Sequence, residues 1–150
     1  MVELMTVYGA FLSRVNEDDW ATCYTPEDMD WFLKDWRAFL DNAISYFKFP
    51  KCSLEIDEKT QCFKDENMTS QEVNVLATYM KQEWLKRTVD SWENIKTQYS
   101  EKDFSQANLL KNFIALKEQV IEEAKLAESI YYRSINKKPF DFKKLAGRRR

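Results

Sequence analysis

The chain has 150 residues, a formal net charge of −2 and 44% hydrophobic residues. This length corresponds to one domain, which can bury enough surface to fold without disulfides or metals. Histidine is absent, which excludes the commonest general base, the commonest metal ligand and every imidazole-based triad. With only two glycines and three prolines, the sequence favours long helices over many short strands.

The sequence also limits where the protein is expected to work. No apolar run reaches the roughly 18 residues that indicate a membrane span, and the N-terminus lacks the basic-then-apolar order of a signal peptide. We therefore expect a soluble protein that does not enter a membrane and is not secreted by the general route. Its cysteines are odd in number, so we expect reduced thiols rather than a disulfide framework: Cys23, Cys52 and Cys62.

The first two predicted elements are helices. Over residues 2–15, apolar residues recur at spacings of three and four, which is typical of an amphipathic helix. The second helix begins at Pro26, behind Thr25 as its N-cap and with two acidic residues in its first turn. We expect it to reach about Tyr46, because the residue before Pro50 is disfavoured in a helix.

Residues 52–63 differ in period, because apolar and polar residues alternate there, and we predict a small β-hairpin. An isolated two-stranded hairpin is marginal unless something packs on it or extends it. Next in the chain, Thr69 and Glu72 form a capping box that predicts the start of a helix running to about Tyr99.

The last predicted helix runs from near Ser105 to about Ile135, roughly 45 Å at 1.5 Å per residue. It is longer than a domain of this size needs for itself, which indicates that something else packs on it. The expected fold is mainly α: a four-helix antiparallel bundle with a long C-terminal helix, the hairpin insertion and an extended C-terminal tail. We divide the chain into a helical domain, residues 1–135, and a basic docking tail, residues 136–150.

The tail differs from the body in charge. It contains seven basic residues and one acid and so carries +6, which leaves −8 for residues 1–135. A flexible segment that carries apolar anchors among cations can order on a partner's groove, although a frayed, solvated terminus is the simpler alternative. The residues assigned to docking are Lys137, Lys138, Pro139, Phe140, Asp141, Phe142, Lys143, Lys144, Leu145, Arg148, Arg149 and Arg150.

The tail cations could also contact nucleic-acid phosphates. The acidic body would repel a duplex lying along it, so sequence-specific binding is not expected. Electrostatic contact between residues 148–150 and nucleic acid or an acidic protein remains open.

Nothing in the sequence indicates catalysis. The carboxylates of residues 17–19 and of Glu118, Glu122 and Glu123 are typical of solvated helix faces, and no metal-binding loop or phosphate-binding glycine motif occurs. We expect no catalytic residue, no cofactor and no metal; Cys52 and Cys62 could face each other across the hairpin, where we expect them to pack as small apolar residues. Five tryptophans, seven tyrosines and ten phenylalanines exceed the needs of one small core, which favours protein interfaces.

Four stretches share their texture and order with a known family: Leu4–Leu12, 47–50 (Phe-Lys-Phe-Pro), 80–85 (Met-Lys-Gln-Glu-Trp-Leu) and 103–110 (Asp-Phe-Ser-Gln-Ala-Asn-Leu-Leu). The chain resembles the head-to-tail adaptor, or neck, proteins of tailed bacteriophages, over most of its length but without a diagnostic catalytic or ligand motif.

The resemblance implies a virion protein of the neck region, assembled in the host cytoplasm. It implies a homo-oligomeric ring, commonly twelvefold, that binds the portal protein through the tail and a downstream neck or tail protein, and that lets DNA pass without sequence specificity. An acidic channel surface would help DNA to slide. We place the subunit interface on the two long helices, at Trp84, Trp92, Phe113, Val120, Ala127 and Tyr131. The alternative is a small helical regulatory module that binds nucleic acid or a host protein.

Overall fold

A computed structural model of the chain describes residues 2–15, 26–98 and 104–136. These residues form four helices and one two-stranded antiparallel sheet, in the order α1 (Leu4–Leu12), α3 (Pro26–Tyr46), β1 (Ile56–Asp57), β2 (Cys62–Phe63), α4 (Ser70–Gln98) and α5 (Phe104–Asn136). The mainly helical class is confirmed, and each predicted helix is present. The predicted tail and the N-cap Thr25 lie outside the described residues.

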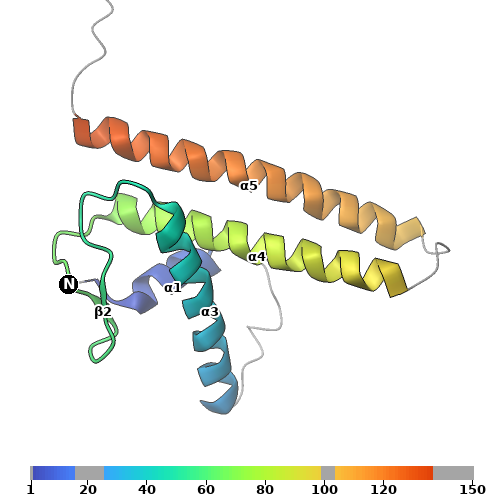
Figure 1. Cartoon of the computed structure of the whole chain (residues 1–150), viewed down its shortest axis with the longest axis horizontal. Helices are drawn as coiled ribbons and strands as arrows, with labels where there is room; N and C mark the ends of the chain where they lie inside the picture. Colours follow the sequence, from blue (N-terminus) through green and yellow to red (C-terminus); the bar gives the residue numbers. More distant parts are fainter. Residues whose placement is uncertain (1, 16–25, 99–103, 137–150) are drawn as a thin grey trace, which may run out of the picture.

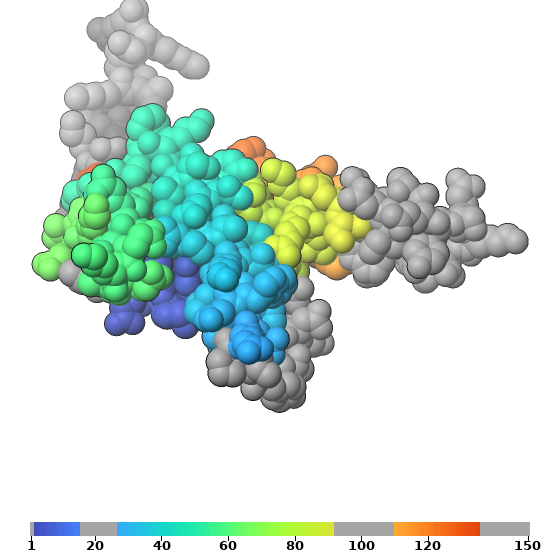
Figure 2. Space-filling model, turned by 60° about the horizontal axis from the view of Figure 1, so that its bottom comes forward, coloured from blue at the N-terminus to red at the C-terminus, as the bar shows by residue number. Residues whose placement is uncertain are grey.

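The two long helices dominate the shape. Figure 1 shows α4 and α5 lying side by side and running in opposite directions, with α3 crossing α4 rather than running along it. Helix α1 packs against the N-terminal part of α4. In the space-filling view the C-terminal part of α4, coloured yellow, extends past the part of the molecule that α3 covers (Figure 2).

The main core lies around the N-terminal half of α4. It is built from apolar side chains of α1, α3, the hairpin and the first turns of α4, and α5 adds only Ala124 and Tyr131 to its buried members. Further along the helix pair, four more buried side chains lie outside this cluster: Leu85, Val89, Leu110 and Val120. The distal part of the α4–α5 pair therefore has an apolar seam of its own.

The capping box at the start of α4 is confirmed. The Glu72 side chain accepts a hydrogen bond from the backbone N–H of Thr69 at 2.7 Å, and the Glu72 N–H donates back to the Thr69 hydroxyl at 3.4 Å. This reciprocal arrangement satisfies donors that the first turn of a helix otherwise leaves unpaired.

The hairpin is shorter than predicted and is extended by the N-terminal segment. Cys62 pairs with Asp57 in the sheet, so Cys52 does not face it across the hairpin, and both cysteines are buried, as expected for small apolar side chains. On the other side of β2, the Phe63 N–H donates to the Val2 carbonyl at 3.0 Å. This additional pairing stabilises the hairpin, which would be only marginally stable as two isolated strands.

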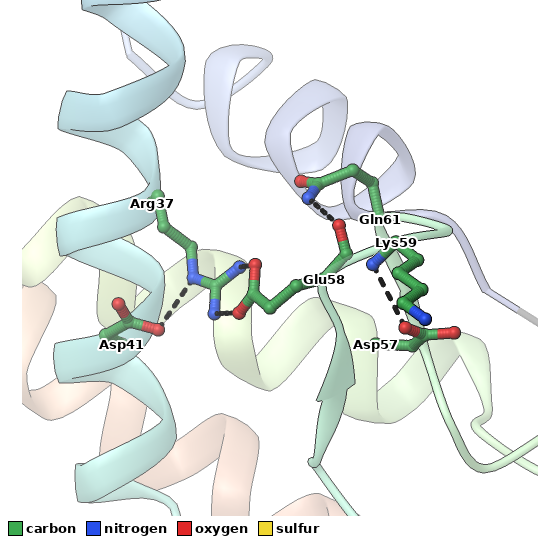
Figure 3. A network of polar contacts seen from close by, with 6 residues as sticks. All are labelled: Arg37, Asp41, Asp57, Glu58, Lys59 and Gln61. Carbon is green, nitrogen blue, oxygen red and sulfur yellow. Dashed lines mark hydrogen bonds and ion pairs between the residues drawn. The ribbon is translucent and has the colours of Figure 1, made fainter.

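The hairpin turn also caps α1 and is tied to α3. The carbonyl of Gln61, a residue with a positive φ of 52°, accepts the N–H of Leu4 at 3.0 Å. Figure 3 shows Arg37 of α3 reaching two carboxylates, Asp41 on its own helix and Glu58 in the turn. The shorter Arg37 to Glu58 distance is 2.7 Å. These contacts fix the turn against the side of α3.

Candidate interaction surface

The structure sorts the predicted interface residues into three groups. Trp84, Phe113 and Ala127 are half-buried, so part of each side chain faces solvent. The side chain of Trp92 lies outside the described residues, as do all residues assigned to the docking tail. Val120 and Tyr131 are 1% and 2% exposed.

Val120 and Tyr131 therefore belong to the interior of the chain itself. Both residues lie on an apolar face of α5, but α4 and the core cover that face at these two positions. A side chain with this little exposed surface cannot supply the contact area of an interface. We correct the prediction at both positions.

Glu72 is the polar centre of the core, with 1% of its surface exposed. One carboxylate oxygen accepts from the N–H and the hydroxyl of Thr69, and the other accepts from the Tyr131 hydroxyl at 2.7 Å and the Cys52 N–H at 3.3 Å. Burial acts to raise the pKa of this carboxyl, but the donors outweigh it and the pKa lies below its usual value. An ionised carboxylate with four donors holds α4, α5 and the chain before the hairpin together.

Two tyrosines of α5 fix the segment that follows α3, which we call the 47–52 segment. The N–H of Lys51 donates to the Tyr131 hydroxyl oxygen at 2.7 Å, and the N–H of Phe49 donates to the Tyr132 hydroxyl oxygen at 3.2 Å. The Tyr132 hydroxyl in turn donates to Glu128. Burial and this carboxylate raise the pKa of Tyr132 to about 12, so the donating hydroxyl stays protonated at neutral pH.

The 47–52 segment exposes a large aromatic ring although its backbone is fixed. Phe49 is 72% exposed, the largest exposed fraction among the large hydrophobic side chains that the structure describes. Lys48 and Lys51 on either side are also exposed. In the sequence, Phe49 indicates the end of a helix and belongs to the stretch 47–50, but neither feature indicates exposure. An aromatic residue that lies between lysines and directly before a proline is the signal that could have identified it as a surface residue.

The outer side of α5 carries a second group of exposed apolar residues. Leu126 and Ile130 are 57% and 49% exposed and lie one turn apart. Glu122 and Glu123 are exposed on the preceding turn. We call these four residues the α5 outer patch. Leu116 is exposed on the same helix toward its N-terminal end.

The surface of the described part of the chain includes two pockets. A pocket of about 480 Å³ lies beside Glu72, Tyr131 and Ser134, and one of about 580 Å³ lies between α1, α3 and the hairpin turn, beside Tyr8 and Arg37. The Cys52 thiol in the first pocket is buried and close to Glu72, and its pKa is raised to about 12. It is therefore a protonated thiol with little nucleophilic character at neutral pH.

Two further features of the described residues concern metal binding and membranes. Their cysteine and carboxylate side chains form no cluster of three or more that could hold a metal ion. None of the helices in those ranges is both long enough and apolar enough to span a bilayer.

Comparisons of the chain with protein-family models, curated proteins and solved structures found no match. The surface described above and the chemistry of its residues are therefore the basis for assigning a function.

Proposed function

We propose that this chain is a structural adaptor of a tailed-phage virion, which forms a closed homo-oligomeric ring between the portal and the next neck or tail component. DNA passes through the ring without sequence-specific contact. The helical body, in which α4 and α5 run antiparallel, packs side by side with its copies, and residues 137–150 dock on the portal. The family is taken from the sequence resemblance; the geometry supports an assembly subunit.

The observation that carries the proposal is the length of the α4–α5 pair relative to the core. Helices of 29 and 33 residues are about 44 and 50 Å long at 1.5 Å per residue. The main core draws on α4 only as far as Met80 among its buried members, although α4 continues to Gln98. Two paired helices that continue past the main core are well suited to packing against neighbouring protein.

The exposed apolar residues support the same conclusion. Phe49, Leu126 and Ile130 are held on rigid elements and left largely uncovered within one chain. Large rigid apolar side chains on a surface are typical of protein interfaces. The described pockets offer no convergent catalytic groups, so a binding role suits this surface better than an enzymatic one.

Deleting residues 137–150 is expected to abolish attachment to the portal while leaving the helical fold unchanged. The deletion removes the +6 charge and both tail phenylalanines and keeps every residue of the core that the structure describes. Co-sedimentation with portal rings measures attachment, and far-ultraviolet circular dichroism checks the fold.

A matched variant separates anchoring from charge. Replacing Phe140 and Phe142 by alanine keeps every tail charge and should weaken attachment nearly as much as the deletion. Unimpaired co-sedimentation of the deleted chain would contradict the proposal. A monomer that does not bind the portal but binds nucleic acid in a salt-dependent way would favour the regulatory module instead.

A further inference from the structure

The 47–52 segment presents a preorganised aromatic knob. The N–H groups of Phe49 and Lys51 are both held by tyrosine hydroxyls of α5, while the Phe49 ring stays 72% exposed. The ring lies 6.3 Å from the Tyr132 ring, centroid to centroid, in a tilted arrangement. A fixed, exposed aromatic loses little conformational freedom on binding and so makes a strong anchor.

The charges around this knob favour an acidic partner. Lys48 and Lys51 are exposed on either side of Phe49. Opposite charges at the edge of an apolar contact steer association and set its register. The fitting surface is therefore apolar at its centre and carries carboxylates at its edge.

The α5 outer patch has this composition. Leu126 and Ile130 supply the apolar centre, and the carboxylates of Glu122 and Glu123 lie one turn away. Glu122 is 2.9 Å from Lys125 and Glu123 is 3.9 Å from Lys81. Exposed pairs of this kind are worth about 0–1 kcal/mol, so both carboxylates remain available to other cations.

The knob and the patch lie on different sides of α5. The knob is held at Tyr132, and two residues along an α-helix correspond to a rotation of about 200°, so Ile130 points nearly the opposite way. The buried Tyr131 faces the core between them. One chain therefore cannot cover its own patch with its own knob.

We propose that the Phe49 knob of one copy docks on the α5 outer patch of a second copy of this chain. The two surfaces are different, so the contact is head-to-tail and repeats from copy to copy until the ring closes. This inference rests on the proposed ring and names the residues that join its subunits. In this contact Phe49 packs on Leu126 and Ile130 of the second copy. Lys48 and Lys51 form ion pairs with its Glu122 and Glu123.

Cross-linking between introduced cysteines tests this contact directly. In a Cys23→Ser background, Lys48→Cys and Glu122→Cys, at the exposed edges of the two surfaces, are made separately and together, so that Phe49, Leu126 and Ile130 stay in place. A short bis-maleimide reagent is added with and without portal. The native Cys52 and Cys62 are buried, and the background chain alone measures any reaction at them.

The head-to-tail contact predicts a specific pattern of products. The double variant gives a ladder of dimers, trimers and larger species, whereas an equal mixture of the two single variants stops at dimers. A control mixture pairs Lys48→Cys with Met5→Cys, at an exposed position on α1 outside the proposed contact. The docked pair should give about tenfold more dimer than the control, because docking raises the local concentration of the two thiols.

Equal dimer yields from the two mixtures would overturn the inference, as would a single variant that cross-links to itself as efficiently as the mixture. Phe49→Asp adds an arm that separates the two proposals. If this variant forms rings on the portal as well as the parent chain does, the proposed function is retained and the proposed contact is disproved. If the unmodified chain forms no ring on the portal, the proposed function fails, while the cross-linking yields still decide whether the contact exists.

Discussion

Replacing Phe63 by alanine is expected to lower the free energy of unfolding by about 4 kcal/mol, near the middle of the range for a buried phenylalanine. Phe63 is fully buried in the main core, and its backbone N–H pairs with Val2 while Ile56 lies opposite it in the sheet. The substitution removes a large apolar contact where the hairpin, the N-terminal segment and the core meet. Urea unfolding followed by circular dichroism measures the change.

Phe49→Ala is the matched control, because it deletes the same atoms from a ring that is 72% exposed. Its effect on unfolding should stay within about 0.5 kcal/mol, as for surface substitutions in general. Similar losses for the two variants would contradict the description of Phe49 as surface and Phe63 as core.

Glu72→Gln is expected to lower the free energy of unfolding by about 2 to 3 kcal/mol at neutral pH, the range for hydrogen bonds to a charged group. The amide keeps the shape of the carboxyl but can accept through only one oxygen. Its NH₂ group would face the Cys52 N–H, which then lacks an acceptor in a buried place. The exposed Glu66→Gln is the control and should change stability little.

The pH dependence gives the sign of the Glu72 contribution. Its pKa in the folded chain is lower than the ordinary value of 4.5, so the folded state favours the ionised form. The resulting stability is fully present above the unfolded pKa and is lost as pH falls through the folded pKa. The difference between the parent chain and Glu72→Gln should therefore shrink with acidification below about pH 4.5. A difference that stays constant down to acid unfolding would contradict the charge-based role.

The helices were predictable because their signals are local. Apolar residues three and four apart, Pro26 at a first turn and the Thr69–Glu72 box are all contained within a few residues of sequence. Helix α3 has the predicted bounds, Pro26–Tyr46, since a proline begins it and another, four residues beyond its end, limits it.

The candidate surface was only partly predictable, because exposure depends on contacts between distant residues. The spacing on α5 marks an apolar face without revealing that α4 and the core cover Val120 and Tyr131. Glu72 was identified as a cap, but its second oxygen binds Tyr131, 59 residues away. From the sequence, Phe49 indicates only a helix end. The folded chain shows that its backbone N–H is hydrogen-bonded while its ring is exposed.

In this protein, the substitutions that lower fold stability should differ from those that weaken assembly. Phe63 and Glu72 lie inside one chain, so their substitution should show in unfolding measurements of the isolated protein. Phe49 and Leu126 lie largely outside it, so their substitution should show in association instead. This division follows from which surfaces one copy buries.

Electron microscopy of the purified chain mixed with portal rings tests the central claim most directly. The account predicts a closed annulus of repeated copies bound coaxially to one end of the portal, with an open channel through both. Portal rings that remain bare at saturating concentrations of the folded chain would contradict it.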